Sequence, residues 1–479
     1  MAETGTMQKT GTGVFVGPGR LRGDLLVPQS KSIAHRAVIC SALARRTLAD
    51  GLPLTGLLHI DRIDTGPASS LSMDIAATRE AMVRLLHGGT EVYCGESGST
   101  LRFLIPVAAA LGRTVTFTGS GRLPERPLGE YGHILEGKGV HLEFPGDKGL
   151  FLPLRIHGEL TSGTFDVPGD VSSQYITGLL LALPLLRGDS AIRITSPLES
   201  AAYIDLTLEV MRAFGVRAGR DAADGMMFRI PGGQRYQDVD YTVEGDYSQA
   251  AFWLTANLLG SRISLQGLDP SSAQGDRQIE DVLAAYRSIH RPASPEEPGL
   301  PSIEDRGVSA GSDGTPVGEV QPGRSTSGAD GSSHRCVRTN ASGEIEIDAS
   351  QIPDLVPILC VAAANTPVRT RIVHAGRLRL KESDRIASSV ALINAIGGSA
   401  EETDDGILLA GSDRPLRGGY VDSAGDHRIA MAAAIAATVT REGVTISDPR
   451  CVNKSYPDFF KDLAQTEGVV YGIDLRKKS

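Results

Sequence analysis

The stretch 170–186, DVSSQYITGLLLALPLL, joins a short polar start to a helical pattern that is apolar on nearly every side. A helix of this kind is buried all round in a globular protein. The same combination of a small polar start and an Ala/Leu-rich helix begins near residues 28, 96, 246, 350 and 426. Recurrence at a period of roughly 70 to 75 residues is typical of a repeated structural unit, so the sequence predicts six copies of one unit.

Each unit also contains short β-type runs and a second, amphipathic helix. Examples are the runs TVTFTG at 114–119 and AIRIT at 191–195, and the helical pattern AATREAMVRLLHGG at 76–89. This mixture predicts an α/β fold with two similar domains, each made of three units, with the apolar helices buried inside. We expect the first domain at 29–244, and a second domain assembled from both chain ends, 1–28 and 245–479.

The interval between the fourth and fifth units is longer than the others. It contains the segment 291–340, which is dominated by Pro, Gly, Ser and charged residues and has almost no periodic apolar positions. Such a composition cannot bury a core, so we expect a flexible, low-complexity insert in the second domain.

The composition argues against several classes of protein. The formal net charge is −9 and aromatic residues make up only 5%, whereas nucleic-acid binders normally carry a basic surface or stacking aromatic rings. The apolar stretches are too short to cross a bilayer, and the first residues, MAETGTMQKTGTG, lack the apolar core of a signal peptide. Five scattered cysteines without a C-x-x-C spacing suggest neither a disulfide framework nor a zinc site. We therefore expect a cytoplasmic protein with no metal, nucleic acid or membrane partner.

The polar starts indicate anion binding. The first N–H groups of a helix are unpaired and lie at the positive end of its dipole, which favours phosphate and carboxylate groups. A single cation beside one such start is commonly a solvated surface residue, so the recurrence of cations carries the argument. The cations in or beside the starts are Lys31, Arg36, Arg102, Arg126, Lys381, Arg385, Arg428 and Lys454.

Nine motifs occur in a defined order along the chain. They are PQSKSIAHR (28–36), GESGSTLRFL (95–104), LPERPL (123–128), SSQYITGLLLALPL (172–185), SAAYID (200–205), IPD (352–354), LKESDRI (380–386), GDHRIAMA (425–432) and NKSYPDFF (453–460). Together they resemble the motifs of the 5-enolpyruvylshikimate-3-phosphate synthase family of enolpyruvyl transferases. The resemblance implies two domains of three βαβαββ units each, an inside-out α/β barrel. It also implies transfer of the enolpyruvyl group of phosphoenolpyruvate to the 5-hydroxyl of shikimate 3-phosphate, by a monomer without a cofactor.

The resemblance also implies two sets of ligands. For shikimate 3-phosphate the matching residues are Lys31, Ser32, Arg36, Ser172, Ser173, Gln174, Ser200, Asp354 and Lys381. For phosphoenolpyruvate they are Lys31, Gly98, Arg126, Gln174, Arg385, Arg428 and Lys454. Arginine forks suit carboxylate and phosphate oxygens, and a glycine allows a ligand to approach the backbone. Because these cations would repel one another across an empty cleft, we expect that cleft to be open.

The reaction implied by the resemblance needs acid/base groups at two places. The attacking 5-hydroxyl must lose a proton, and the methylene carbon of phosphoenolpyruvate must gain one and later return it. Asp354 matches the family's base, Glu382 matches the residue associated with the methylene carbon, and Lys31 could share either role. Alternatively, Asp354 could cap the following helix and Glu382 could only pair with Arg385. His427 is either a proton carrier or a structural residue.

Some positions depart from the family pattern. Arg377 stands where an Asn that contacts shikimate is usual, and Phe103, Ser97 and Ser99 replace the commoner residues around Gly98. The response to glyphosate, the family's inhibitor, therefore does not follow from the resemblance. One alternative is the sister transferase for UDP-N-acetylglucosamine, but the corresponding loop 119–132, GSGRLPERPLGEYG, lacks that enzyme's reactive Cys. The other is a protein that binds phosphorylated metabolites without catalysis.

Overall fold

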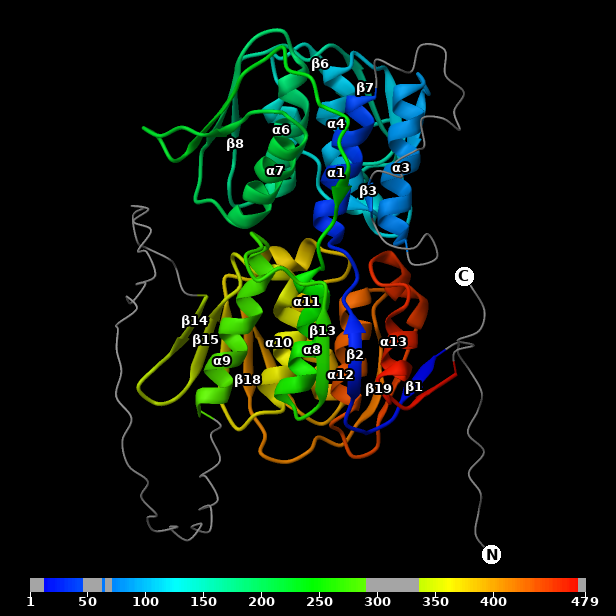
Figure 1. The fold of residues 1–479 in the computed structure, drawn as a ribbon, viewed down its shortest axis with the longest axis vertical. Helices are drawn as coiled ribbons and strands as arrows, with labels where there is room; N and C mark the ends of the chain where they lie inside the picture. Colours follow the sequence, from blue (N-terminus) through cyan, green and yellow to red (C-terminus); the bar gives the residue numbers. More distant parts are fainter. Residues whose placement is uncertain (1–12, 46–62, 65–70, 290–335, 473–479) are drawn as a thin grey trace, which may run out of the picture.

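The computed structural model describes residues 13–45, 63–64, 71–289 and 336–472, which form two lobes stacked along the longest axis (Figure 1). Each lobe has its own hydrophobic core. The core of the first lobe is drawn from residues between Ile33 and Val243. The core of the second lobe combines Val14–Leu25 with residues between Tyr247 and Leu463, so both ends of the described chain contribute to it.

The chain passes between the lobes at two adjacent places. Gln29 and Gly245 form an isolated β-bridge, the amide of Ser30 donates to the carbonyl of Glu244 at 2.8 Å, and the amide of Asp246 donates to the carbonyl of Pro28 at 2.8 Å. We propose these two crossings as the domain boundaries, which would separate 29–244 from 1–28 and 245–479. The two separate cores support that division.

The first lobe contains most of its helices in the interior and short strands around them. Its helices are α1 (Lys31–Ala44), α3 (Met73–Leu86), α4 (Gly98–Ala110), α5 (Glu130–Ile134), α6 (Ser173–Ala182) and α7 (Ala201–Ala213), with 3₁₀ turns η4 (Leu123–Glu125) and η5 (Leu183–Leu185). Its strands are β3 (Ile63–Asp64), β4 (Glu91–Tyr93), β5 (Val115–Thr118), β6 (Val140–Glu143), β7 (Leu154–Gly158), β8 (Thr164–Val167), β9 (Ser190–Ile194), β10 (Gly219–Arg220), β11 (Met227–Ile230) and β12 (Tyr241–Thr242).

The second lobe is built in the same way. Its helices are α8 (Tyr247–Leu258), α9 (Ile279–Ile289), α10 (Val356–Ala364), α11 (Arg385–Ala395), α12 (His427–Ala437) and α13 (Phe459–Gln465), with 3₁₀ turns η6 (Gly275–Gln278), η7 (Pro353–Leu355), η8 (Gly376–Leu380) and η9 (Pro449–Lys454). Its strands are β1 (Val14–Val16), β2 (Arg22–Leu26), β13 (Arg262–Gln266), β14 (Val337–Thr339), β15 (Ile345–Asp348), β16 (Thr370–Val373), β17 (Ser399–Thr403), β18 (Gly406–Ala410), β19 (Gly419–Val421), β20 (Val444–Ile446) and β21 (Val470–Tyr471).

Four of the sheets share one topology, in which a parallel pair of strands is extended on one side by two antiparallel strands. Their orders are β4-β5-β7-β6, β10-β11-β9-β8, β14-β15-β16-β18-β17 and β19-β20-β1-β21, with β14 as an additional antiparallel edge strand. The two remaining sheets are parallel pairs, β2 with β13 and β3 with β12. This recurrence of topology agrees with the repeated unit predicted from the sequence.

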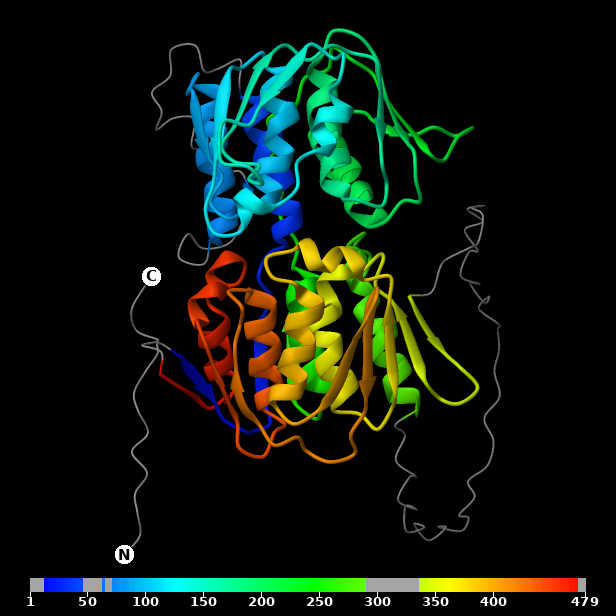
Figure 2. The ribbon, with the colours of Figure 1, turned by 180° about the vertical axis from the view of Figure 1, so that it is seen from behind.

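The apolar helices lie inside the lobes, as expected. Every residue of α10 and α12 is buried, and α4 and α6 are buried along almost their whole length. Strands lie along the outside of both lobes, with helices between them, when the molecule is seen from behind (Figure 2). A helix with apolar residues on all sides can be stable in water only when it is surrounded in this way.

The expected insert, 291–340, falls mainly outside the described residues. Its last part is an exception, because Cys336 is buried and Val337–Thr339 form strand β14, which pairs with β15. The expected insert therefore extends too far at its C-terminal end, because a strand of three residues is too short to be recognised by alternation. No helix in the described part of the chain is both long enough and apolar enough to cross a membrane.

Candidate active site

A cavity of about 130 Å³ lies between the lobes and is lined by residues of both. Helices α1, α4, α6 and α12 begin beside it, and the η7 turn presents Asp354 to it just before α10 begins. Five of the six predicted polar starts therefore meet at one place. The sixth start, before α8, lies behind them, where Asp246 accepts a hydrogen bond from the amide of Lys31 at 3.1 Å.

The site residues expected from the sequence line this cavity, with one exception. Those that line it are Lys31, Ser32, Arg36, Gly98, Arg126, Ser172, Ser173, Gln174, Ser200, Asp354, Lys381, Glu382, Arg385 and Arg428. The exception is Lys454, which lines a neighbouring hollow together with Glu96 and Glu382. The side chain of Lys454 forms an ion pair with Glu96, and its Nζ also donates to the carbonyl of Gly425 at 3.1 Å.

The first-lobe wall of the cavity is formed by the starts of α1, α4 and α6. Two small polar residues cap α4 and α6 of this wall. Ser97 accepts a hydrogen bond from the amide of Thr100 at the start of α4, and Ser172 accepts one from the amide of Gln174 at the start of α6. The Gln174 amide group is itself fixed, because it donates to Ser99 at 2.9 Å and accepts from Arg102 at 2.8 Å. These caps satisfy part of the N-terminal amides and hold the side chains of the α6 start in place.

Arg36 is the most buried cation of the first-lobe wall, with 3% of its surface exposed. It donates to Thr207 at 2.8 Å, to Thr177 at 3.3 Å and to the carbonyl groups of Ser32 and Tyr203 at 2.5 and 2.9 Å. Burial lowers the pKa of Arg36 to about 10, so the group stays charged at neutral pH. All four of these partners are neutral, and its positive charge is therefore available to an anion.

Gly98 and Arg126 are packed against each other at the start of α4. A Cβ atom placed on Gly98 would lie 2.5 Å from Nη1 of Arg126, so no larger residue fits without moving the guanidinium group. Burial and the nearby charge of Arg102 lower the pKa of Arg126 to about 10. Across the cleft, Nη1 of Arg126 lies 3.8 Å from Glu382.

The second-lobe wall is organised around Arg385, whose side chain is 1% exposed. Its guanidinium group contacts three carboxylates at 2.8 Å each, those of Asp354, Glu382 and Asp426. Asp426 also caps α12 by accepting from the amide of Arg428. A buried arginine can be stable here because every side of its planar fork meets a carboxylate.

Asp354 is held between several cations. Its Oδ1 accepts from Arg385 and lies 3.7 Å from Nζ of Lys381, and its Oδ2 accepts from Arg428 at 3.0 Å. Burial alone would raise the pKa of Asp354, but the charges of Arg428, Lys381 and Arg385 hold it well below its usual range. Its side chain makes no capping hydrogen bond to the following helix, so the alternative interpretation as a cap is not supported.

Glu382 makes the ion pair with Arg385 that the alternative interpretation anticipated. It also faces the cavity and approaches Arg126 of the opposite lobe, so the pair does not exclude a chemical role. Burial opposes ionisation of Glu382, but Arg385 and Arg126 hold its pKa well below the usual value. The carboxylate is therefore ionised at neutral pH in this arrangement.

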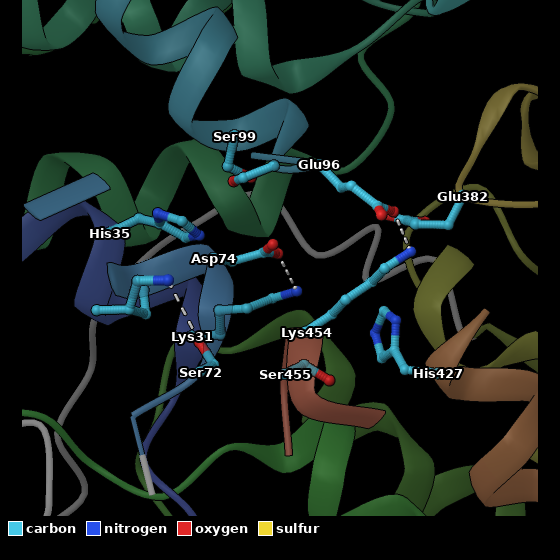
Figure 3. Close-up of polar contacts among 12 residues, drawn as sticks. Lys31, His35, Ser72, Asp74, Glu96, Ser99, Glu382, His427, Lys454 and Ser455 are labelled. Carbon is cyan, nitrogen blue, oxygen red and sulfur yellow. Dashed lines mark hydrogen bonds and ion pairs between the residues drawn. The ribbon is translucent and has the colours of Figure 1, made fainter. Parts of the chain in front are cut away.

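Two lysines from opposite lobes point into the same region (Figure 3). Lys31 pairs with Asp74 of α3 at 2.9 Å, while Lys454 of the second lobe pairs with Glu96 of the first. His427 lies near them, and burial lowers its pKa to about 3, with the charge of Lys31 acting in the same direction. Its ring is therefore neutral, and its Nδ1 is 3.6 Å from Asp426, too far for a normal hydrogen bond.

Arg377, which stands at the position that departs from the family pattern, also lines the cavity. It reaches across the lobes, where its Nε pairs with Glu199 at 3.0 Å and its Nη2 donates to Ser200 at 2.8 Å. Ser200 has a left-handed backbone, with φ of 54°, which is unusual for a residue other than glycine. This strained residue of the first lobe is thus held at the cavity by contacts with the second lobe.

The comparison with family models matches residues 16–287 and 318–463 to the EPSP synthase (3-phosphoshikimate 1-carboxyvinyltransferase) model. The chain belongs to this family. It is 39% identical to the 3-phosphoshikimate 1-carboxyvinyltransferase of Clostridium acetobutylicum, covering 96% of this chain and 99% of that protein. It is 38% identical to that of Clostridium kluyveri, covering 95% and 98%.

Solved structures resemble the fold of this family member. The EPSP synthase of Acinetobacter baumannii superposes with a TM-score of 0.64 at 20% identity, covering 96% of this chain and 99% of that one. The fold is therefore the two-domain EPSP synthase fold, as the sequence motifs indicated.

Several residues of the site region were not anticipated, including Glu199 and Asp426, which pair with Arg377 and Arg385. Asp74 and Glu96 neutralise Lys31 and Lys454, and Asp276 with Tyr203 lies behind Asp354. Tyr203 and Glu96 lie in or beside quoted motifs, but only their neighbours matched known ligand positions. Asp74 and Asp276 lie in ordinary helix starts, and no local pattern indicates that they face the site.

Proposed function

We propose that this chain transfers the enolpyruvyl group of phosphoenolpyruvate to the 5-hydroxyl of shikimate 3-phosphate and releases phosphate. Membership of the 3-phosphoshikimate 1-carboxyvinyltransferase family supports the reaction, which serves the biosynthesis of chorismate and the aromatic amino acids. The observation that carries the proposal for this chain is the meeting of Asp354 and Glu382 with the cations of both lobes around one cavity.

Shikimate 3-phosphate would bind mainly on the first-lobe side. Ser172, Ser173, Ser200 and Lys381 would hold its phosphate and ring hydroxyls. Ser32 and Arg36 would also contact the shikimate, and Gln174 would lie between the two substrates. The neutral partners of Arg36 support this assignment, because its charge needs an anion. Serine hydroxyls and first-turn amides are the usual ligands of a phosphate at a helix N-terminus.

Phosphoenolpyruvate would bind nearer the second lobe, with Arg126, Arg385, Arg428 and Lys454 around its phosphate and carboxylate. The close packing of Arg126 on Gly98 supports a defined position for one guanidinium fork. Lys454 would have to exchange its pair with Glu96 for the ligand. Lys31, between the two walls, would contact both substrates.

Asp354 would accept the proton of the 5-hydroxyl, since its low pKa keeps it ionised at neutral pH. Glu382 would protonate the methylene carbon and take the proton back as phosphate leaves. For this, Glu382 must first become neutral. An incoming anion that occupies Arg126 and Arg385 would weaken the field that now lowers its pKa, and so favour the protonated form.

Phosphate release from shikimate 3-phosphate and phosphoenolpyruvate tests the proposal, with UDP-N-acetylglucosamine as the competing acceptor. We expect turnover only with shikimate 3-phosphate. The sister reaction is not favoured, because all five cysteines are buried and none lines the cavity. Phosphate release only with the nucleotide sugar would overturn the proposal, and binding without turnover would favour a non-catalytic protein.

We further propose that the protein acts as a cytoplasmic monomer. All of the expected site residues come from a single chain, so the cavity needs no second copy. Five unpaired, buried thiols fit a reducing compartment. Light scattering of the purified protein tests the oligomeric state, and a dimer mass would contradict it.

A further inference from the structure

Behind Asp354, away from the cavity, lies a second carboxyl group that the reaction as proposed above does not use. Asp276, on η6, is 5% exposed, and its Oδ2 accepts a hydrogen bond from the hydroxyl of Tyr203 at 3.0 Å. The same hydroxyl lies 3.4 Å from Oδ2 of Asp354. Tyr203 therefore bridges the carboxyl that faces the substrates and one that does not.

If Asp276 and Asp354 are both ionised, the hydroxyl of Tyr203 has too few protons to donate a hydrogen bond to each of them. A phenol has a single O–H and can donate to one carboxylate at a time, so its second contact is favourable only when that carboxyl carries a proton. In addition, Oδ1 of Asp276 is buried and has no hydrogen-bond partner among the described residues. A buried carboxylate oxygen without a donor is costly, and protonation of the group removes much of that cost.

The charged and titratable groups around Asp276 come from several elements. Asp354 on η7, Arg428 on α12, Asp246 before α8 and Tyr203 on α7 all act on it. On its own element, Arg277 turns away and donates to the carbonyl of Pro270. Burial, with the charge of Asp354 in the same direction, raises the pKa of Asp276 to about 7, whereas the pKa of Asp354 is held well below its usual range.

We propose that Asp276 receives, through Tyr203, the proton that Asp354 takes from the 5-hydroxyl group. This inference rests on the proposed function. Asp276 is a positioning residue in this scheme, because it acts through Tyr203 and Asp354 and does not line the cavity.

The proton transfers balance without any further reactant. The O–H bond of the 5-hydroxyl breaks, its electron pair stays on the oxygen that attacks phosphoenolpyruvate, and its proton bonds to Oδ2 of Asp354. Asp354 then passes a proton to the oxygen of Tyr203 while Tyr203 gives its own proton to Oδ2 of Asp276. Asp354 and Tyr203 regain their starting forms, Asp276 becomes neutral, and it returns the proton to solvent after phosphate has left.

The relay also depends on the two lobes being together. Tyr203 belongs to the first lobe, whereas Asp276 and Asp354 belong to the second. Transfer from Asp354 to Asp276 is downhill because the group with the higher pKa ends with the proton. The relay therefore removes the proton from Asp354 only while the lobes are closed on the substrates.

Asp276→Asn and Tyr203→Phe test the relay in steady-state and single-turnover assays from pH 5.5 to 9. In the wild-type protein, kcat should rise with pH through about 7, as Asp276 loses its own proton and becomes able to accept another. Both variants should lose this rise and lower kcat by about 10- to 100-fold with KM changed less than about threefold. The double variant should be no slower than the slower single variant.

Asp462→Asn is the matched control. Asp462 accepts from the hydroxyl of Tyr456 at 2.7 Å, and burial raises its pKa to about 6, but it does not line the active-site cavity. This variant should keep the wild-type pH profile, which also carries any titration of the substrate phosphates.

An unchanged pH profile in Asp276→Asn, or a raised KM with kcat preserved, would overturn the relay. If Asp276→Asn does not fold, Tyr203→Phe alone decides, and a wild-type profile in that variant overturns the inference. Failure of the proposed function is distinguishable, because the wild-type protein would then release no phosphate from the two substrates at any pH.

Discussion

The two walls of the cavity are stabilised by different interactions. On the first-lobe wall, Arg36 and Arg102 make hydrogen bonds to hydroxyl, amide and carbonyl groups, and no carboxylate in the described part of the chain pairs with them directly. On the second-lobe wall, Arg385 alone contacts three carboxylates. The first wall therefore has positive charge to offer an anion, whereas charges on the second wall are nearly balanced and can respond to the gain or loss of one proton.

Because of this difference, the guanidinium groups of the first wall are suited to binding anions, and the packed acids and bases of the second wall are suited to proton transfer. Uncompensated guanidinium groups with fixed neutral partners favour phosphate and carboxylate ligands without changing protonation. Closely packed acids and bases have interdependent pKa values, so a ligand that removes one interaction shifts the others. We expect changes to the carboxylates of the second wall to affect kcat and changes to the guanidinium groups of the first wall to affect binding.

Asp354→Asn should produce the largest effect, because it removes the proposed base from the centre of the second wall. We expect kcat to fall by about 100-fold or more with a much smaller change in the Michaelis constants. The substitution also leaves the charges of Arg385, Arg428 and Lys381 partly uncompensated. Single-turnover measurements check the chemical step directly. If kcat is preserved and only the Michaelis constants rise, Asp354 is a binding residue and the division between the walls is wrong.

Gly98→Ala tests the first wall and should produce the next largest effect. The new Cβ would lie 2.5 Å from Nη1 of Arg126, so that flexible guanidinium group must move away. Since misplacement of a binding group by about 1 Å can cost up to about 100-fold, we expect the KM for phosphoenolpyruvate to rise about 10- to 100-fold. The affinity for shikimate 3-phosphate, measured by calorimetry, should stay within about twofold.

Gly132→Ala is the matched control for this prediction. Gly132 is also a helical glycine, on α5, and a Cβ there meets no atom within 4 Å. An equal effect of the two substitutions, or an unchanged KM for phosphoenolpyruvate in Gly98→Ala, would show that Arg126 does not need its present position.

The lowered pKa of Lys381 predicts that binding of shikimate 3-phosphate depends on pH, with a smaller effect than those of the two substitutions above. Burial, with the charges of Arg385 and Arg377, lowers the pKa of Lys381 to about 8. In the free protein the ammonium group is therefore lost as the pH rises through 8, and an anion then loses one cationic partner. We expect the affinity for shikimate 3-phosphate to fall by about tenfold between pH 7 and pH 9 in calorimetry.

Lys381→Arg provides the comparison, because an arginine stays protonated throughout this range. Its affinity should change by less than about twofold between pH 7 and pH 9. A decline in Lys381→Arg as steep as that of the wild-type protein would assign the titration to another group.

Periodicity and ordered motifs were sufficient to predict most of the fold. The buried helices α10 and α12 follow from runs that are apolar at every position in α10 and at every position after Arg428 in α12, and the repeated sheet topology follows from the recurrence of one unit. The strand Val337–Thr339 was missed because three residues beside a polar segment are too few to show alternation.

The cations of the site and the carboxylates Asp354 and Glu382 were predictable, but the carboxylates that pair with cations of the opposite lobe were not. Cations were recognised at helix starts, which are local features, whereas Glu96 and Glu199 pair with Lys454 and Arg377 only across the two lobes. We expected an open cleft because the cations alone would repel. The open unliganded cleft stays a prediction, but groups of opposite charge face each other across the cleft in the structure, so repulsion between cations is not the only interaction between the lobes.

Removing the segment between the two ranges matched by the family model should have the smallest effect, because that segment is not part of the matched family pattern. The match leaves out residues 288–317, and the described helix α9, which ends at Ile289, packs against β14, which starts at Val337. Deleting residues 291–317 should change kcat/KM by less than about threefold, because loop-closure entropy varies slowly with length. Replacing the same residues with an equally long Gly/Ser segment separates composition from length. Loss of more than about tenfold in kcat/KM with the deletion, about 1.4 kcal/mol, would mean that groups outside the two walls control the reaction.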